Sequence, residues 1–220
     1  MEVCLTGEDK EWMVTFNRTI FEASVQDKKF AYIVTLGRAV NTILFIHSVN
    51  RDPANDKPSV RRDRLNSYLF GSAVIFESLN LIESMITEFS GDEIFQNGLR
   101  AILNDETAKQ IKKAHLKGVR HQAVFHFDPK AFGDALKKTS FYDCPFVLSR
   151  GESRQDLSYQ LSDIVAAEIL VGLPSDTEQF MATLGNAMRK TSELVDKFVQ
   201  HSEELIIHHL KRWGYIKMDC

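Results

Sequence analysis

A guanidinium group and two imidazole groups lie close together in one short segment near the middle of the chain. Arg120 is followed directly by His121, and His126 ends the seven-residue run. Arginine is permanently charged and offers a planar set of donors that suits a phosphate. Histidine titrates near neutral pH, so it can both take up and release a proton. Such residues can cleave RNA without a metal, because a histidine removes the proton of the 2′-hydroxyl while the arginine stabilises the charge that develops on the phosphate.

The segment that leads to Arg120 is strongly basic. Residues 109–127 contain four lysines, one arginine and no acid, although the whole chain has a net charge of −3. Lys109, Lys113 and Lys117 recur every four residues, so a helix would align them with Arg120 in one stripe. Like charges in such a stripe repel one another unless an anion or a partner neutralises them. We expect these three lysines to bind RNA; a solvated helix face is the alternative interpretation.

The run from Arg120 to His126 resembles the R-x(4–6)-H signature of the HEPN superfamily, in which a polar residue often follows the arginine. The phenylalanines on both sides of His126 are also similar to HEPN segments near the end of a late helix. The resemblance covers residues 28–135, and the last third of the chain has no family feature. It implies an all-α bundle.

The HEPN resemblance also implies an activity. Many members are metal-independent endoribonucleases that work as homodimers, with the motifs of both protomers facing one cleft. In that arrangement Arg120 would stabilise the phosphate, His126 would act as general acid and base, and His121 would assist. Some members carry an acid on an earlier helix. Glu77 is the candidate for this orienting acid, although we favour a surface position for it.

The resemblance implies a biological setting and a second class of function. Family members serve in toxin–antitoxin, phage-defence and RNA-processing systems. Other members have lost activity and act as binding or dimerisation modules. The alternative to an endoribonuclease is therefore a non-catalytic adaptor that binds RNA or an acidic, antitoxin-like protein.

Helix geometry constrains how the motif can work. On a regular α-helix, six residues rotate by about 600°, which leaves Arg120 and His126 about 120° apart around the axis. Either the last turn before Pro129 tightens toward a 3₁₀-helix, or the site combines residues of two protomers across a two-fold axis. The second arrangement fits the family better. A histidine satisfied inside the core is the structural alternative for His126.

A divalent metal is a third possibility, at a different place in the chain. His201, Glu204 and His208 are spaced three and four residues apart, so they share one stripe of a long helix. No fourth ligand is evident, and the Glu-x-x-His and His-Glu-x-x-His patterns of metal-binding helices are absent. We therefore predict neither a metal nor a cofactor in the active site.

Composition favours a soluble, cytoplasmic protein. The chain of 220 residues is 44% hydrophobic with only 11 Gly and 5 Pro, which excludes disordered and collagen-like classes. Its three cysteines are far apart and form no C-x-x-C pair, so neither a disulfide framework nor a thiolate metal site is expected. The start of the chain lacks an export signal. The most apolar stretches, Thr42–His47 and Ile164–Leu173, are too short to span a membrane.

Apolar residues recur three or four positions apart over most of the chain, which predicts helices. The predicted helices span residues 28–50, 60–89, 93–104, 106–127, 130–138, 161–172 and 176–213. We predict an all-α fold, a mostly antiparallel helical bundle to which one small β-hairpin near 144–160 could be attached. Residues 1–220 would form a single domain. Its HEPN-like core would lie at 28–135, and a C-terminal extension at 140–220 would carry the long helix.

Overall fold

The computed structural model describes residues 17–48, 57–110, 112–113, 129–138, 148–149, 158–171 and 177–216. Within these ranges the chain is mostly helical, which confirms the predicted all-α class. The helices are α1 (Arg18–Ser24), α2 (Lys28–Ser48), α3 (Pro58–Met85), α4 (Glu93–Asn97), α5 (Leu99–Asn104), α6 (Glu106–Gln110), α7 (Pro129–Lys138), α8 (Gln160–Val171) and α9 (Thr177–Arg212).

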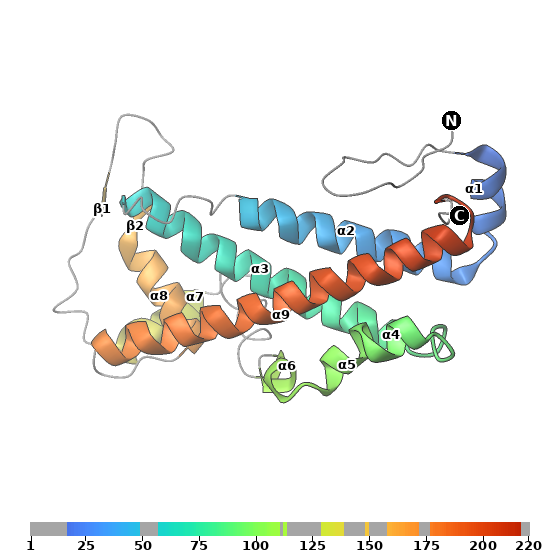
Figure 1. The fold of residues 1–220 in the computed structure, drawn as a ribbon. Helices are drawn as coiled ribbons and strands as arrows, with labels where there is room; N and C mark the ends of the chain where they lie inside the picture. Colours follow the sequence, from blue (N-terminus) through green and yellow to red (C-terminus); the bar gives the residue numbers. More distant parts are fainter. Residues whose placement is uncertain are drawn as a thin grey trace, which may run out of the picture.

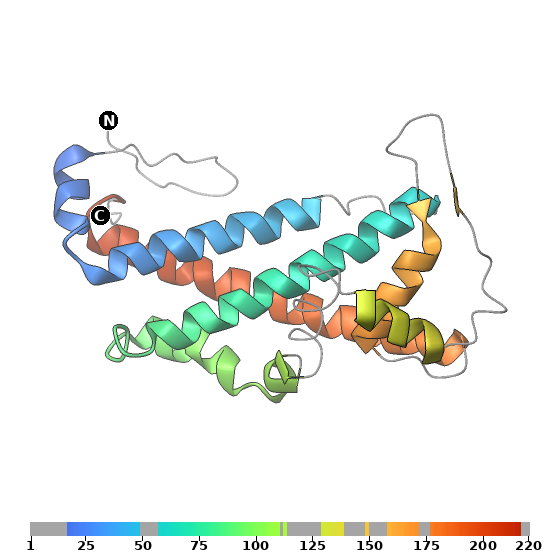
Figure 2. The same cartoon turned by 180° about the vertical axis from the view of Figure 1, so that it is seen from behind.

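Three long helices, α2, α3 and α9, form the centre of the bundle (Figure 1). α2 packs against both α3 and α9, and the short α4, α5 and α6 pack against α9 along one side (Figure 2). α7 and α8 pack against each other, and α8 also contacts α3 and α9. The last turns of α9 therefore lie near α4, while its first turns lie near α8 (Figure 1).

Apolar residues at helical spacing build one continuous core between these helices. Its fully buried members include Leu36 and Ile43 of α2, Ile75, Leu79 and Ile82 of α3, Phe95 of α4, and Phe198 and Leu205 of α9. Burial of each such side chain contributes roughly 1.5–3 kcal/mol to stability. Because α9 supplies core residues, the segment predicted as a C-terminal extension is an integral part of the bundle.

Local signals explain several helix boundaries. Asn17 begins α1, where its Oδ1 accepts a hydrogen bond from the Ile20 N–H at 3.2 Å. Asp92 begins α4 in the same way, since its Oδ1 accepts a hydrogen bond from the Phe95 N–H at 3.0 Å. Pro58 opens α3, at a position where a missing N–H costs no hydrogen bond. α1 is not among the helices that the sequence analysis predicted.

The helix predicted at 93–104 is divided into α4 and α5 at Gly98. A Cβ atom at this position would lie 2.8 Å from the Ile94 carbonyl oxygen and 3.1 Å from Nδ1 of His201. Only glycine can occupy this position without a shift of the backbone or of α9. Gly98 lies close to His201 of α9. Asp92, which precedes α4, contacts His209 near the end of the same helix.

Two predicted elements fall partly outside the described residues. α6 and the adjacent Lys112–Lys113 turn lie in the predicted helix at 106–127, and residues 111 and 114–128 are outside the described residues. Near 144–160, β1 (Leu148–Ser149) pairs with β2 (Ser158–Tyr159) in an antiparallel register that places Leu148 opposite Tyr159. This is a short form of the predicted hairpin.

The apolar stretch Thr42–His47, predicted to be too short to span a membrane, belongs to a longer apolar helix, α2. Its first 19 residues have a mean hydropathy of 1.3, and only 17% of that window is buried, so α2 is long and apolar enough to cross a membrane. One such helix is weak evidence for a membrane protein, because core helices of soluble proteins meet the same criterion. Its apolar surface residues are Val34, Leu44 and Phe45, which are 57%, 51% and 69% exposed.

Candidate functional site

The catalytic residues that the sequence predicts lie outside the described residues. Arg120, His121, His126 and the RNA-binding Lys117 all belong to residues 114–128, between α6 and α7. Both flanking helices are packed in the bundle, α6 against α5 and α9 and α7 against α8. The predicted catalytic roles therefore stay predictions.

The structure describes Lys109, Lys112 and Lys113 at the start of the basic segment, and the first two form ion pairs. Lys109 Nζ lies 2.6 Å from Glu106 Oε1, and Lys112 Nζ lies 2.6 Å from Glu83 Oε1 on α3. Lys113 is exposed. Because Lys109 and Glu106 are both well exposed, this pair contributes about 0.2–1 kcal/mol, so a phosphate can replace the glutamate. Glu106 lies three residues before Lys109 and is not among the site residues predicted from the sequence.

Glu77, the candidate orienting acid, is exposed on α3. Its Oε2 accepts a hydrogen bond from Asn80 Nδ2 at 3.3 Å on the same helix. An orienting contact with Arg120 would have to start from this surface position.

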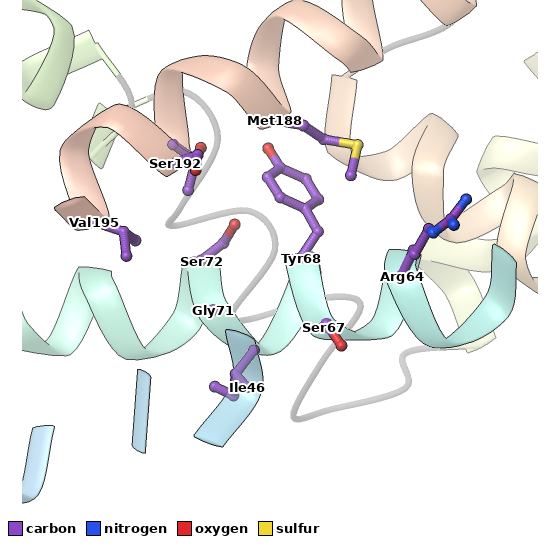
Figure 3. Close-up of a pocket in the computed structure, with 10 residues that line it drawn as sticks. Ile46, Arg64, Ser67, Tyr68, Gly71, Ser72, Met188, Ser192 and Val195 are labelled. Carbon is purple, nitrogen blue, oxygen red and sulfur yellow. The ribbon is translucent and has the colours of Figure 1, made fainter. Parts of the chain in front are cut away.

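A pocket with a mostly apolar lining and a few hydroxyl groups lies between α3 and α9, next to the end of α2 (Figure 3). It has a volume of about 270 Å³, and Figure 3 shows Tyr68 extending from α3 toward Met188 and Ser192 of α9. Three buried hydroxyls, those of Tyr68, Ser72 and Thr191, have no hydrogen-bond partner among the described residues. Burial raises the pKa of Tyr68, and the nearby Thr191 and Ser72 hydroxyls oppose this effect. These three hydroxyls are the groups that could hydrogen-bond to a water molecule or a small hydroxylated ligand in the pocket.

A buried acid–base pair connects the end of α9 to the start of α4. Nε2 of His209 lies 2.9 Å from Oδ2 of Asp92, and the two side chains are 0% and 4% exposed. Burial by itself would raise the pKa of Asp92, but the hydrogen bond from the Phe95 N–H and the contact with His209 lower it below its usual value. Burial lowers the pKa of His209, and Asp92 opposes this only in part. The pair is therefore an ionised carboxylate beside a neutral imidazole.

Aromatic residues enclose this pair, and one further histidine adjoins it. The ring of His209 lies 5.4 Å from that of Phe89 and 5.2 Å from that of Trp213. His208 is the next residue of α9, and its ring lies 5.2 Å from that of His209 at an angle of 87°. Asp92, His208 and His209 each offer a metal-ligand atom, and these three atoms lie within 4.8 Å of one another.

The stripe predicted as a possible metal site is divided by the structure. His201 Nδ1 lies 3.0 Å from Glu204 Oε2, so these two residues pair with each other. His208 instead joins His209 and Asp92. Asp92 and His209 were not among the residues predicted from the sequence, because the two are 117 residues apart. The local sequence indicates only that Asp92 can cap a helix, because it follows Ser90 and Gly91 and directly precedes α4.

No protein-family model, no curated protein and no solved structure matches this chain. The HEPN resemblance therefore rests on the motif of residues 120–126 and on an all-α fold.

Proposed function

We propose that this chain is a HEPN-like, metal-independent endoribonuclease that acts as a cytoplasmic homodimer, in a toxin–antitoxin or phage-defence setting. The observation that carries the proposal is the run from Arg120 to His126 at the end of a basic segment, in a chain whose described part is all-α. An all-α bundle is the fold that the motif implies. Many unrelated proteins share this fold class, so the motif provides the more specific support.

The proposed reaction is an attack of the RNA 2′-hydroxyl on the adjacent phosphate. His126 takes the proton of the hydroxyl, Arg120 neutralises the charge that develops on the phosphate, and His121 assists. The 5′-oxygen leaves with a proton from a histidine. No step needs a metal, because a cation and a proton carrier suffice.

The basic segment supports RNA as the substrate. Lys109 and Lys113 are exposed on the described side of the motif, and an RNA chain lying along them would lead to Arg120. The ion pair of Lys112 with Glu83 holds the start of this segment against α3. We infer that Lys109, Lys113 and Lys117 bind the phosphates that flank the cleaved bond.

The test is cleavage of a single-stranded RNA in the presence of EDTA. His126→Ala and Arg120→Ala should each reduce the rate by at least about 100-fold, the usual contribution of a general acid–base group. His201→Ala is the matched control, since it removes a histidine that pairs with Glu204 on α9, and should cleave like the wild type. Full activity in both motif variants, or a need for added metal, would contradict the proposal.

The second candidate function is a non-catalytic HEPN-like dimerisation or adaptor module. The observation that favours it is the exposed apolar side chains of α2, of which Phe45 is the most exposed, with Phe70 of α3 also 48% exposed. Apolar surface of this kind is typical of protein interfaces. Under this function the wild type would not cleave RNA, and Phe45→Asp would reduce the mass measured by light scattering from dimer to monomer.

A further inference from the structure

Two adjacent histidines of α9 and one aspartate at the start of α4 converge at the closed end of the bundle. We propose that Asp92, His208 and His209 bind a divalent transition-metal ion of the zinc class, with water at the remaining positions. The ligand atoms of the three residues lie within 4.8 Å of one another. This site is separate from the motif of residues 120–126, and the proposed RNA cleavage does not use it.

The donors are of the type that zinc-class ions prefer. Two imidazoles and one carboxylate form a mixed nitrogen and oxygen set, which suits Zn²⁺, Co²⁺ and Ni²⁺ better than Ca²⁺ or Mg²⁺. Two of the three donors are buried, so a bound ion would be largely shielded from water on that side.

The Nε2 atom of His209 is the ring atom that faces Asp92, at 2.9 Å from Oδ2. Because a carboxylate only accepts hydrogen bonds, the ring carries its proton on Nε2 when no metal is bound. Its Nδ1 is buried and has no hydrogen-bond partner among the described residues. An ion bound between Nε2 and Oδ2 would take the place of the Nε2 proton, and the ring would then carry its proton on Nδ1.

The distance between the two buried donors is compatible with a shared ion. With metal–ligand bonds of about 2.0–2.2 Å, the 2.9 Å between His209 Nε2 and Asp92 Oδ2 corresponds to an angle of roughly 90° at the metal. Neighbouring ligands in octahedral coordination make this angle. If the two donor atoms moved apart by a few tenths of an ångström, the angle at the metal would approach that of tetrahedral coordination. His208 is half-buried, so its ring can rotate toward the ion, and its open side provides the entry path.

The surrounding charges favour a cation. Asp27 accepts a hydrogen bond from Trp213 Nε1–H at 3.1 Å, and the Trp213 ring lies 5.2 Å from that of His209, so a second carboxylate lies near the site. Lys29 is the opposing cation, and its Nζ lies 4.9 Å from the centre of the Phe89 ring. The carboxylates of Asp92 and Asp27 and the ammonium group of Lys29 together give these groups a net negative charge, which favours a cation.

The test uses the full-length protein after removal of metal with EDTA and dialysis. Titration with Zn²⁺ should give one ion bound per chain, and titration with Co²⁺ should give the visible absorption of a coordinated ion. His208→Ala should weaken binding at least tenfold while leaving the buried Asp92–His209 pair intact. Asp92→Asn retains a side chain that can cap α4 and should weaken binding by a similar factor.

His201→Ala is the control, because it removes a neighbouring histidine of α9 that pairs with Glu204 and not with the proposed ligands. It should bind Zn²⁺ like the wild type. Three results would overturn the proposal: no binding by the wild type at millimolar Zn²⁺, unchanged binding by His208→Ala, or loss of binding in His201→Ala. If Asp92→Asn does not fold, His208→Ala alone decides, since its side chain is half-exposed. Zinc binding and RNA cleavage are measured separately, so failure of one leaves the other standing.

Discussion

Removal of the Asp92 side chain should destabilise the fold more than removal of any ordinary helix cap. Asp92→Ala removes the hydrogen bond to the Phe95 N–H, which costs about 1 kcal/mol. It also leaves the buried His209 without a partner at Nε2, which costs a further 1–3 kcal/mol or so. We therefore expect the free energy of unfolding to fall by about 2–4 kcal/mol.

Asp105→Ala is the matched control for this experiment. Asp105 caps α6 through the Ala108 N–H at 3.3 Å and pairs with Lys197 at 2.9 Å, but its side chain is 28% exposed. A cap and a surface ion pair together are worth about 1–2 kcal/mol. Urea unfolding at pH 7 in EDTA measures both variants without any contribution from bound metal. A loss of only about 1 kcal/mol in Asp92→Ala, the value of the helix cap alone, would refute the reasoning that the Asp92–His209 contact stabilises the fold.

Two further predictions concern Tyr68 and Gly98. Because burial raises the pKa of Tyr68, its contribution to stability is complete below the pH of about 10 at which the unfolded phenol ionises, and it is lost as the pH rises above that value. Tyr68→Phe should remove this alkaline loss when unfolding is measured between pH 9 and 11, and an unchanged pH profile would contradict the prediction. Gly98→Ala should cost about 1–3 kcal/mol, because its Cβ would lie 2.8 Å from the Ile94 carbonyl oxygen. Gly133→Ala, in the open space of α7, should instead stabilise by up to about 1 kcal/mol in the same urea assay.

The positions of the long helices could be predicted from the sequence. Ile33, Leu36 and Ile43 recur at helical spacing, and all three are buried on α2. The long helix predicted at 176–213 agrees with α9 within one residue at each end. These predictions succeed because a helix repeats every 3.6 residues, so its buried face is written into a short stretch of sequence.

The break at Gly98 and the divided histidine stripe could not be predicted in this way. Gly98 fits at the division because the Ile94 carbonyl and His201 leave no room for a Cβ atom there, and the contact with His201 exists only after α9 has packed. On an isolated helix His201, Glu204 and His208 share one stripe. In the folded chain α4 and α5 contact only part of α9, so His208 meets Asp92 while His201 meets Glu204.

The sequence by itself determined the all-α class, the main helices and the Arg120–His126 motif on which the proposed activity depends. These are properties of residue type and of spacing within a few turns of helix. Only the tertiary structure decided that Asp92 and His209, 117 residues apart, become a buried pair with His208 beside them. No local pattern encodes such a meeting, because it depends on how distant helices pack and on which side chains that packing removes from water.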